Sequence, residues 1–357
     1  MLNVDSSTGT DEPRLTSLSH GGGCGCKIAP GLLSEMLRAS PAFPVPEALL
    51  VGNETADDAA VYRLNDEQAL VATTDFFMPI VDDPYDFGRI AATNAISDVY
   101  AMGARPILAL ALVGMPIKVL STATIGRILE GGASVCAAAG IPVAGGHTID
   151  SVEAIYGLVA LGLVHPDHVK RNSDAQPGDV LVLSKPIGVG VMSAALKKGQ
   201  LAPDQYRQMI ETTTRLNTPG PDLAKIAGVH AMTDVTGFGL AGHALELARG
   251  SGCRVELDWR AVPLLAEARE LAERGNVTGA SGRNWDSYGA EVALSRGFSA
   301  ADRALLTDPQ TSGGLLVACA PSALDAVMSV LRQRGFAAAS VVGSVTAAGQ
   351  GPRLAIG

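Results

Sequence analysis

The chain has 357 residues, of which 47% are hydrophobic and 18% are charged, and its formal net charge is −9. This length predicts about two domains, and the acidic balance excludes nucleic acid as a main partner, because a phosphate backbone is repelled by a negative surface. The longest apolar run, residues 107–117, is too short to span a bilayer, which takes ~20 residues. Residues 1–20 lack the apolar core of a signal peptide. We therefore expect a cytoplasmic protein with reduced thiols and no membrane contact.

Residues 1–19 are polar, and we expect them to be disordered. They precede His20-Gly-Gly-Gly-Cys24-Gly-Cys26-Lys27. Glycines let this segment close over a ligand and open again, and the nearby cations favour the thiolate form of the cysteines. The segment is either a mobile loop with a nucleophile and a phosphate-binding lysine, or a glycine-rich tail with incidental cysteines.

The next elements place aspartates at the ends of apolar strands. After a predicted helix at 31–39, strands are expected at 58–62 and 69–74, and these carry Asp57, Asp58 and Asp75. Asp75 could simply cap a turn. Two adjacent carboxylates, Asp57 and Asp58, against a hydrophobic strand indicate a bound partner, because a buried charge is costly without one. A cation relieves their repulsion best.

Asp83 and Pro84 predict the start of a helix that ends at Gly103. Its Asn94 and Asp98 are four residues apart, so they share one helix face. This pair either binds metal and phosphate or is a satisfied polar pair in the core. A strand at 106–113, a helix at 122–139 and a strand at 141–144 follow. Gly145-Gly146-His147-Thr148 then resembles a backbone-amide phosphate cradle, although two glycines also form an ordinary turn. A strand is expected at 156–164.

Residues 170–178 are polar and end in Pro-Gly, which predicts a domain boundary. The second half alternates strands and helices, and Asp234 comes at a strand end, beside glycines and a helix start, where anions or a bridging metal bind. Residues 281–288 are expected to form a polar loop, and 308–314 a turn. The remaining predicted helices are 191–197, 203–215, 221–227, 240–249, 263–274 and 322–334, and the strands are 179–183, 255–259 and 315–320.

Several kinds of site are excluded. The chain has no Gly-Lys dipeptide and therefore no Walker-type loop, and it lacks the kinase catalytic set and a second cysteine pair for structural zinc. What remains is a set of separated aspartates, a lysine and glycine turns. Mg²⁺ takes one or two carboxylates together with substrate phosphates, so this set predicts ATP bound through several metal ions.

Seven motifs carry a resemblance to a known family: the His20–Lys27 segment, Gly52-Asn-Glu-Thr55-Ala-Asp57-Asp58, Thr73-Thr-Asp75-Phe-Phe-Met-Pro, Ala92-Thr-Asn94-Ala-Ile-Ser-Asp98, Gly145-Gly-His147-Thr148, Met232-Thr-Asp234-Val-Thr-Gly-Phe-Gly and Asp308-Pro-Gln-Thr-Ser-Gly-Gly. With these motifs the chain resembles, over about residues 15 to 350, the selenophosphate synthetase (selenide, water dikinase) family.

The resemblance implies a fold of mixed α/β and α+β class, like that of aminoimidazole ribonucleotide synthetase. A flexible segment at 1–50 would precede an ATP- and Mg²⁺-binding domain at 51–170, which pairs in a homodimer, and an α+β domain at 171–357. The implied reaction converts ATP, selenide and water into selenophosphate, AMP and phosphate, for selenocysteine and selenouridine synthesis.

The resemblance also assigns roles by motif position. Cys24 and Lys27 are then catalytic. The implied ATP-binding residues are Lys27, Thr55, Ala56, Asp57, Asp75, Asp98, Gly146, His147 and Thr148, and the implied Mg²⁺ ligands are Asp58, Asp98 and Asp234. Ala56 can contribute backbone contacts only. Two alternatives stay open, namely another ATP-dependent ligase of the same fold and a non-enzymatic thiol or metal carrier.

Overall fold

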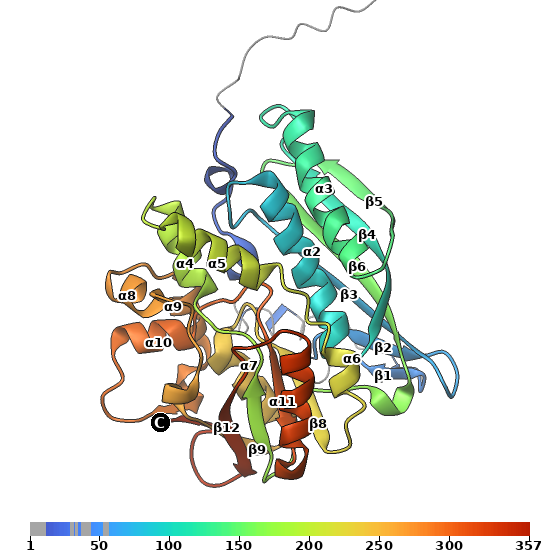
Figure 1. The fold of residues 1–357 in the computed structure, drawn as a ribbon, viewed down its shortest axis with the longest axis vertical. Coiled ribbons are helices and arrows are strands. Elements are labelled where there is room, and N and C mark those ends of the chain that lie inside the picture. The colour runs from blue at the N-terminus through green and yellow to red at the C-terminus, as the bar shows by residue number, and fades with distance from the viewer. Residues whose placement is uncertain (1–11, 29–31, 33–34, 37–43, 53–56) are drawn as a thin grey trace, which may run out of the picture.

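The computed structural model describes residues 12–28, 32, 35–36, 44–52 and 57–357, and it contains two sheets that follow one another along the chain (Figure 1). The predicted helix at 31–39 lies mostly outside these residues. The first sheet has six strands in the order β1-β2-β3-β6-β4-β5. Its strands are β1 Leu49–Val51, β2 Ala60–Arg63, β3 Ala69–Phe77, β4 Arg105–Met115, β5 Val143–Asp150 and β6 Ile155–Val164.

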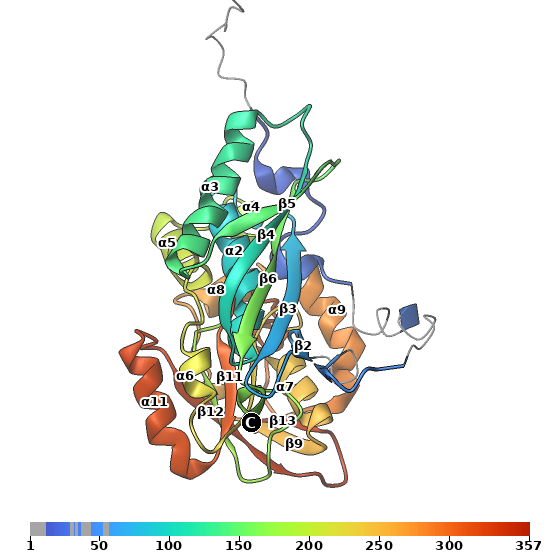
Figure 2. The same ribbon diagram turned by 90° about the vertical axis from the view of Figure 1, so that its right-hand side faces the viewer.

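Two long helices cover one face of this sheet, and Figure 2 shows the strands in front of them, with none of the described helices on the near face. They are α2 Pro84–Ala101 and α3 Thr122–Ala138. Asp83 caps α2 by accepting a hydrogen bond from the Asp86 amide, as its position before a proline predicted. The predicted strands and helices of this half are confirmed with shifts of a few residues at their ends.

The Gly145-Gly146 pair is different from the turn that we expected. Both glycines lie inside the edge strand β5, with φ of +127° and +157°. A Cβ on Gly146 would lie 2.0 Å from the Ala111 carbonyl oxygen, and the register of β4 and β5 shifts here. The glycines therefore allow two strands to approach closely at an irregularity, and they do not form a separate phosphate-binding turn within this chain.

The second sheet has seven strands in the order β10-β13-β9-β12-β7-β11-β8. Helices lie on both of its faces (Figure 1), and the last of them, α11 Leu324–Gln333, covers a separate apolar cluster that includes Val182, Met232, Val317 and Leu331. The strands are β7 Val180–Leu183, β8 Val229–Asp234, β9 Cys253–Leu257, β10 Val292–Leu294, β11 Leu315–Cys319, β12 Ser340–Ala347 and β13 Leu354–Ile356. The helices are α4 Val189–Lys197, α5 Pro203–Thr213, α6 Gly220–Leu223, α7 Gly239–Gly250, α8 Ala268–Glu273, α9 Gly279–Tyr288, α10 Ala300–Leu306 and α11 Leu324–Gln333.

Three expectations for local structure were wrong. Residues 281–288 belong to helix α9, because Thr278 caps its first turn and the buried Asn284 and Tyr288 tie it to the rest of the domain. Such tertiary contacts override the weak helix propensity of its glycines. The helix expected at 263–274 is reduced to α8. Residues 15–18 form a 3₁₀ turn, in which Thr16 is held by Asp82, where disorder was expected.

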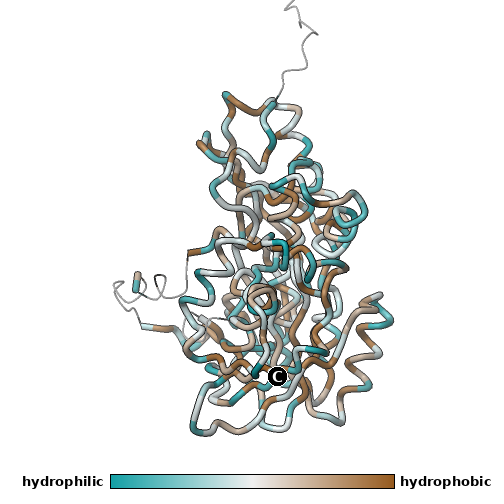
Figure 3. The backbone as a smooth tube through the Cα atoms, turned by 90° about the vertical axis from the view of Figure 1, so that its left-hand side faces the viewer, coloured by the Kyte–Doolittle hydropathy of each residue, from teal (hydrophilic) through white to brown (hydrophobic). Residues whose placement is uncertain are grey.

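Hydrophobic residues are interspersed with hydrophilic ones along the whole described chain, as Figure 3 shows. Most of the buried ones form one large core that extends through both halves, and the smaller cluster under α11 is separate from it. None of the described helices combines the length and the apolarity needed to cross a bilayer.

Candidate active site

The Cys24 thiol lies at the junction of the two halves. Cys24 is part of a short 3₁₀ turn, Gly23–Cys26, and is only 1% exposed. Its Sγ donates to the side-chain oxygen of Asn94 at 3.2 Å, and its amide donates to Thr311 Oγ1 at 3.1 Å. The Gly23 amide donates to the Met78 carbonyl at 2.9 Å. The glycine loop is therefore seated in a closed position, with its thiol facing inward.

Asp75 links this thiol to the lysine of the same loop. The Asn94 amide group donates to the Asp75 carboxylate, which is 8% exposed, and Lys27 Nζ lies 3.7 Å from that carboxylate. Asp75 raises the pKa of Lys27, so Lys27 stays charged. Cys24, Lys27 and Asp75, three residues proposed from the sequence, are brought together here.

The protonation state of the thiol is opposite to the one we expected. Burial raises the pKa of Cys24 well above its ordinary value, the negative charge of Asp75 raises it further, and Lys27 offsets these effects only in part. Burial also raises the pKa of Cys26. His20 does not help, because its exposed ring contacts Glu153 at 2.9 Å. With the loop closed, Cys24 is a neutral thiol at neutral pH.

Three further carboxylates gather beneath the loop, each held by a hydroxyl group. Asp58 accepts from Thr233 at 2.9 Å, Asp98 accepts from Thr73 at 2.6 Å, and Asp234 accepts from Ser97 at 2.5 Å. Asp58 comes from the segment before β2, Asp98 from α2, and Asp234 from the end of β8. Residues from both halves of the chain thus form one acidic cluster.

The charges of this cluster favour a cation. Burial raises the pKa of Asp58, and repulsion by Asp234 and Asp98 raises it further; burial and the same kind of repulsion raise the pKa of Asp98. Burial likewise raises the pKa of Asp234. Among the described residues, no three His, Cys, Asp or Glu side chains already form a metal-binding group. The donor chemistry therefore fits a hard cation such as Mg²⁺, while the side chains are not yet arranged around a single ion.

The residues expected to bind ATP are divided between two places. Thr55 and Ala56 lie outside the described residues. Asp57 accepts from the Asn172 amide at 2.7 Å. Gly146, His147 and Thr148 are exposed on β5, at the opposite edge of the sheet from β1. Their strand is thus not part of the cluster around Cys24 in a single chain.

Sequence reasoning missed the residues that hold the loop from the opposite side. Ser312 is fully buried and has φ of +52°, a conformation that costs about 1–2 kcal/mol outside glycine. Its amide donates to Asn94 Oδ1 at 2.7 Å, and the buried Lys185 Nζ donates to its carbonyl at 2.8 Å. Burial lowers the pKa of Lys185 to about 7. The one available signal was the Asp308–Gly314 turn, a polar segment directly before an apolar strand.

That turn also connects the site to α4. The Asp308 carboxylate accepts from the amides of Gly190 and Val191 at 2.9 and 3.2 Å, and the Gln310 side chain accepts from the two preceding amides. The backbone amides at the start of α4 have no acceptor within the helix, and these two side chains supply one. Because Thr311 in the same turn contacts Cys24, the turn couples the second sheet to the loop.

The comparisons with known proteins cover nearly the whole chain. The family of AIR synthase related proteins matches residues 56–164 with its N-terminal domain and residues 176–353 with its C-terminal domain. A selenide, water dikinase of Burkholderia orbicola (strain MC0-3) is 67% identical over 93% of this chain and 94% of the relative. One of Pseudomonas straminea is 62% identical over 97% and 96%, and one of Rhizobium meliloti (strain 1021) is 60% identical over 94% and 96%.

Solved structures share the fold at low sequence identity. Thiamine-monophosphate kinase from Stenotrophomonas maltophilia K279a is 20% identical, with a TM-score of 0.62 over 92% of this chain and 96% of that one. Hydrogenase maturation protein HypE in complex with ATP is 19% identical, with a TM-score of 0.61 over 95% and 91%. The mixed two-domain fold expected from the sequence is thereby confirmed.

Proposed function

Because this chain belongs to the selenide, water dikinase family of AIR synthase related proteins, we propose that it makes selenophosphate from selenide, ATP and water and releases AMP and phosphate. The observation that carries the proposal is the meeting of an inward-facing thiol with a cluster of carboxylates. Cys24 Sγ is one hydrogen bond from Asn94, and Asn94 in turn contacts Asp75, above the acidic cluster.

Cys24 is the group that handles selenium in this proposal. A sulfur atom suits a soft element, and the closed loop presents the thiol toward the interior, away from bulk water. Opening the loop removes the burial that holds the pKa of Cys24 high, so the open loop, into which selenide can enter, holds a larger fraction of thiolate than the closed loop. Closure then brings the charged Lys27, which is 40% exposed, over the carboxylates.

ATP binds beneath the loop, with Lys27 directed at its phosphates. Mg²⁺ would be held by Asp58, Asp98 and Asp234, and when bound it supplies positive charge that neutralises the phosphates. The repulsion among these carboxylates supports this assignment, because a cation removes it. Thr73, Thr233 and Ser97 orient the three side chains through hydrogen bonds.

A homodimer would complete the nucleotide site. None of the described helices covers the other face of the first sheet. Phe76, which alternates along β3 with the buried Asp75 and Phe77, is 50% exposed, and Ile149 on the edge strand β5 is 55% exposed. A second copy of the chain is the partner that we propose for this face, since burying such a surface favours association. In that arrangement Gly146, His147 and Thr148 on β5 act on the nucleotide together with the aspartates. A soluble reaction in the cytoplasm, without membrane or nucleic acid, is part of the same proposal.

Phosphorus NMR of the products after incubation with ATP, Mg²⁺ and selenide tests the proposal directly. We expect a selenophosphate signal together with AMP and phosphate, all dependent on selenide. Cys24→Ser should abolish these products while the binding of a non-hydrolysable ATP analogue stays within about threefold of wild type. ATP turnover that is independent of selenide would point to a different ligase of this fold, and absence of turnover under reducing conditions would point to a carrier.

A further inference from the structure

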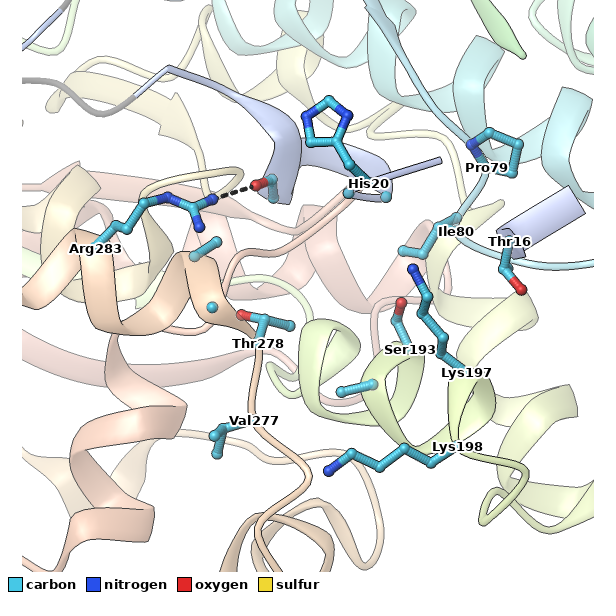
Figure 4. A pocket seen from close by; sticks show the side chains of 16 residues that line it. Thr16, His20, Pro79, Ile80, Ser193, Lys197, Lys198, Val277, Thr278 and Arg283 are labelled. Atoms are coloured by element: carbon cyan, nitrogen blue, oxygen red, sulfur yellow. Dashed lines mark hydrogen bonds between the residues drawn. The ribbon is translucent and has the colours of Figure 1, made fainter. Parts of the chain in front are cut away.

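A cavity of about 300 Å³ lies on the other side of the glycine loop from the carboxylate cluster. Gly21, Gly22 and Gly25 form its roof, whereas the Cys24 side chain points away from it, toward Asn94. Its walls are the end of α4 and the start of α9 (Figure 4). This volume is at the lower end of the range for small-molecule sites, and none of the described residues assigned to ATP, metal or selenium lines it.

Three cations surround this cavity without carboxylate partners. Figure 4 shows Lys197 at the end of α4, Lys198 directly after it, and Arg283 on α9 at a different wall. Among the described residues, the acceptor of each is a backbone carbonyl: Lys197 donates to Ser19 at 3.3 Å, Lys198 to Gly275 at 2.9 Å and Arg283 to Gly25 at 3.0 Å. Within the described part of the chain, none of the three forms an ion pair and no Asp or Glu lines the cavity.

This concentration of positive charge runs against the charge of the whole protein, which is −9. Three like charges around one small volume repel one another, and an anion placed between them removes that repulsion. The cavity is therefore electrostatically suited to a ligand that carries more than one negative charge.

The remaining donors select the type of anion. Hydroxyl groups of Ser193 and Thr278 line the cavity, and Gly279 and Ala280 bring the first two amides of the ten-residue helix α9 to its wall. Such amides have no partner within the helix and favour anions. Many hard hydrogen-bond donors match the several oxygens of a phosphate group, whereas selenide is soft and accepts hydrogen bonds poorly.

We propose that this cavity is a second anion site, which binds a tetrahedral phosphate-class product separately from the nucleotide. The inference rests on the proposed function in one respect, since that reaction releases two such anions, phosphate and selenophosphate. The site also communicates with the loop. Arg283 and Lys197 hold the backbone at Gly25 and Ser19, on either side of the His20–Cys24 segment, so the bound anion and the loop carbonyls share the same donors.

Isothermal titration calorimetry with the whole protein tests the site. The nucleotide site is first saturated with a non-hydrolysable ATP analogue and Mg²⁺, and inorganic phosphate is then titrated at low ionic strength. We expect one phosphate per chain, with affinity lowered at least tenfold in Lys198→Ala and in Arg283→Gln. Lys118→Ala removes an equal charge from an exposed lysine elsewhere and should leave the affinity unchanged. A parallel titration with thiophosphate, a stable sulfur analogue of selenophosphate, shows which product the site prefers.

Two results would overturn the inference: no saturable phosphate binding by the wild type, or equal affinity in wild type, Lys198→Ala and Arg283→Gln. Both substituted side chains are exposed, and the melting temperature of each variant shows whether it is folded. Selenide-dependent AMP formation by the wild type is measured on the same sample. Turnover without phosphate binding refutes the anion site alone, and phosphate binding without selenide-dependent turnover refutes the proposed function alone.

Discussion

Asn94 is the side chain whose replacement tests the description of the site most sharply. It is fully buried on α2, and it joins three elements by hydrogen bonds to the Cys24 thiol, the Asp75 carboxylate and the Ser312 amide. Asn94→Leu keeps the approximate volume and removes all three bonds. The Ser312 amide is then buried without an acceptor, and Asp75 loses a donor.

The expected magnitude follows from these contacts. A buried amide without a partner costs about 1–3 kcal/mol, and a hydrogen bond to a charged group contributes about 1.5–3 kcal/mol. Burial of the added methyl groups recovers part of this, at about 0.8 kcal/mol per CH₂ equivalent. We therefore expect the free energy of unfolding, measured by urea denaturation, to fall by about 2–4 kcal/mol.

The neighbouring Thr93 provides a matched control. It is also buried on α2, but its hydroxyl donates only to the Arg89 carbonyl of the same helix, at 2.8 Å. Such bonds within a helix contribute little, so Thr93→Val should change the free energy of unfolding by less than about 0.5 kcal/mol.

The effect on the loop is measured by alkylation of Cys24 with iodoacetamide, followed by peptide mass spectrometry. Asn94→Leu removes the acceptor of the thiol, so the closed loop should open more often and Cys24 should react at least about tenfold faster than in wild type. Selenide-dependent AMP formation should fall in parallel. If Asn94→Leu changes the stability by less than about 1 kcal/mol and leaves the alkylation rate unaltered, the proposed role of Asn94 is wrong.

Three further predictions concern the loop, the turn and the metal site. Gly23 has φ of +54°, and a Cβ there would lie 2.3 Å from Thr311 Oγ1, whereas the atom nearest to a Cβ on Gly25 would be 3.4 Å away. Gly23→Ala should therefore speed Cys24 alkylation about tenfold, and Gly25→Ala should change it less than about twofold. Equal alkylation rates in the two variants would argue against the closed loop. Burial raises the pKa of Asp308 from 3.8 to about 7, so between these pH values the folded protein holds a proton that the unfolded chain releases. The free energy of unfolding should therefore decrease by up to about 4 kcal/mol as pH rises from about 4 to about 7. Urea denaturation across this range should show a flatter dependence of this free energy on pH for Asp308→Asn than for wild type, and parallel dependences would contradict the assignment. Asp58→Asn should weaken Mg²⁺-dependent binding of an ATP analogue at least tenfold by calorimetry, and an unchanged Mg²⁺ titration would remove Asp58 from the proposed ligands.

The sequence by itself determined the elements with strong local signals. Asp83-Pro84 and Gly103 marked the two ends of α2, and alternating or continuous apolar runs located β3, β4 and β6, because these patterns depend on neighbours in the chain. The glycine-flanked thiol and the strand-end aspartates were also visible as separate motifs. The boundary expected at residues 170–178 stays a prediction, although the first sheet ends at Val164 and the second begins at Val180.

Only the tertiary structure decided how these motifs meet and which state they adopt. Helix α9 forms although its sequence is polar and glycine-rich, since Thr278 caps it and the rest of the domain packs against it. The Cys24 thiol is neutral in spite of Lys27, because burial and Asp75 outweigh one lysine, and neither effect can be counted from spacing along the chain. Thr311, whose hydroxyl accepts from the Cys24 amide, lies 287 positions from Cys24 along the chain, and its sequence gave no local sign of that contact. Local interactions fix secondary structure, whereas burial and the meeting of distant charges are properties of the folded chain alone.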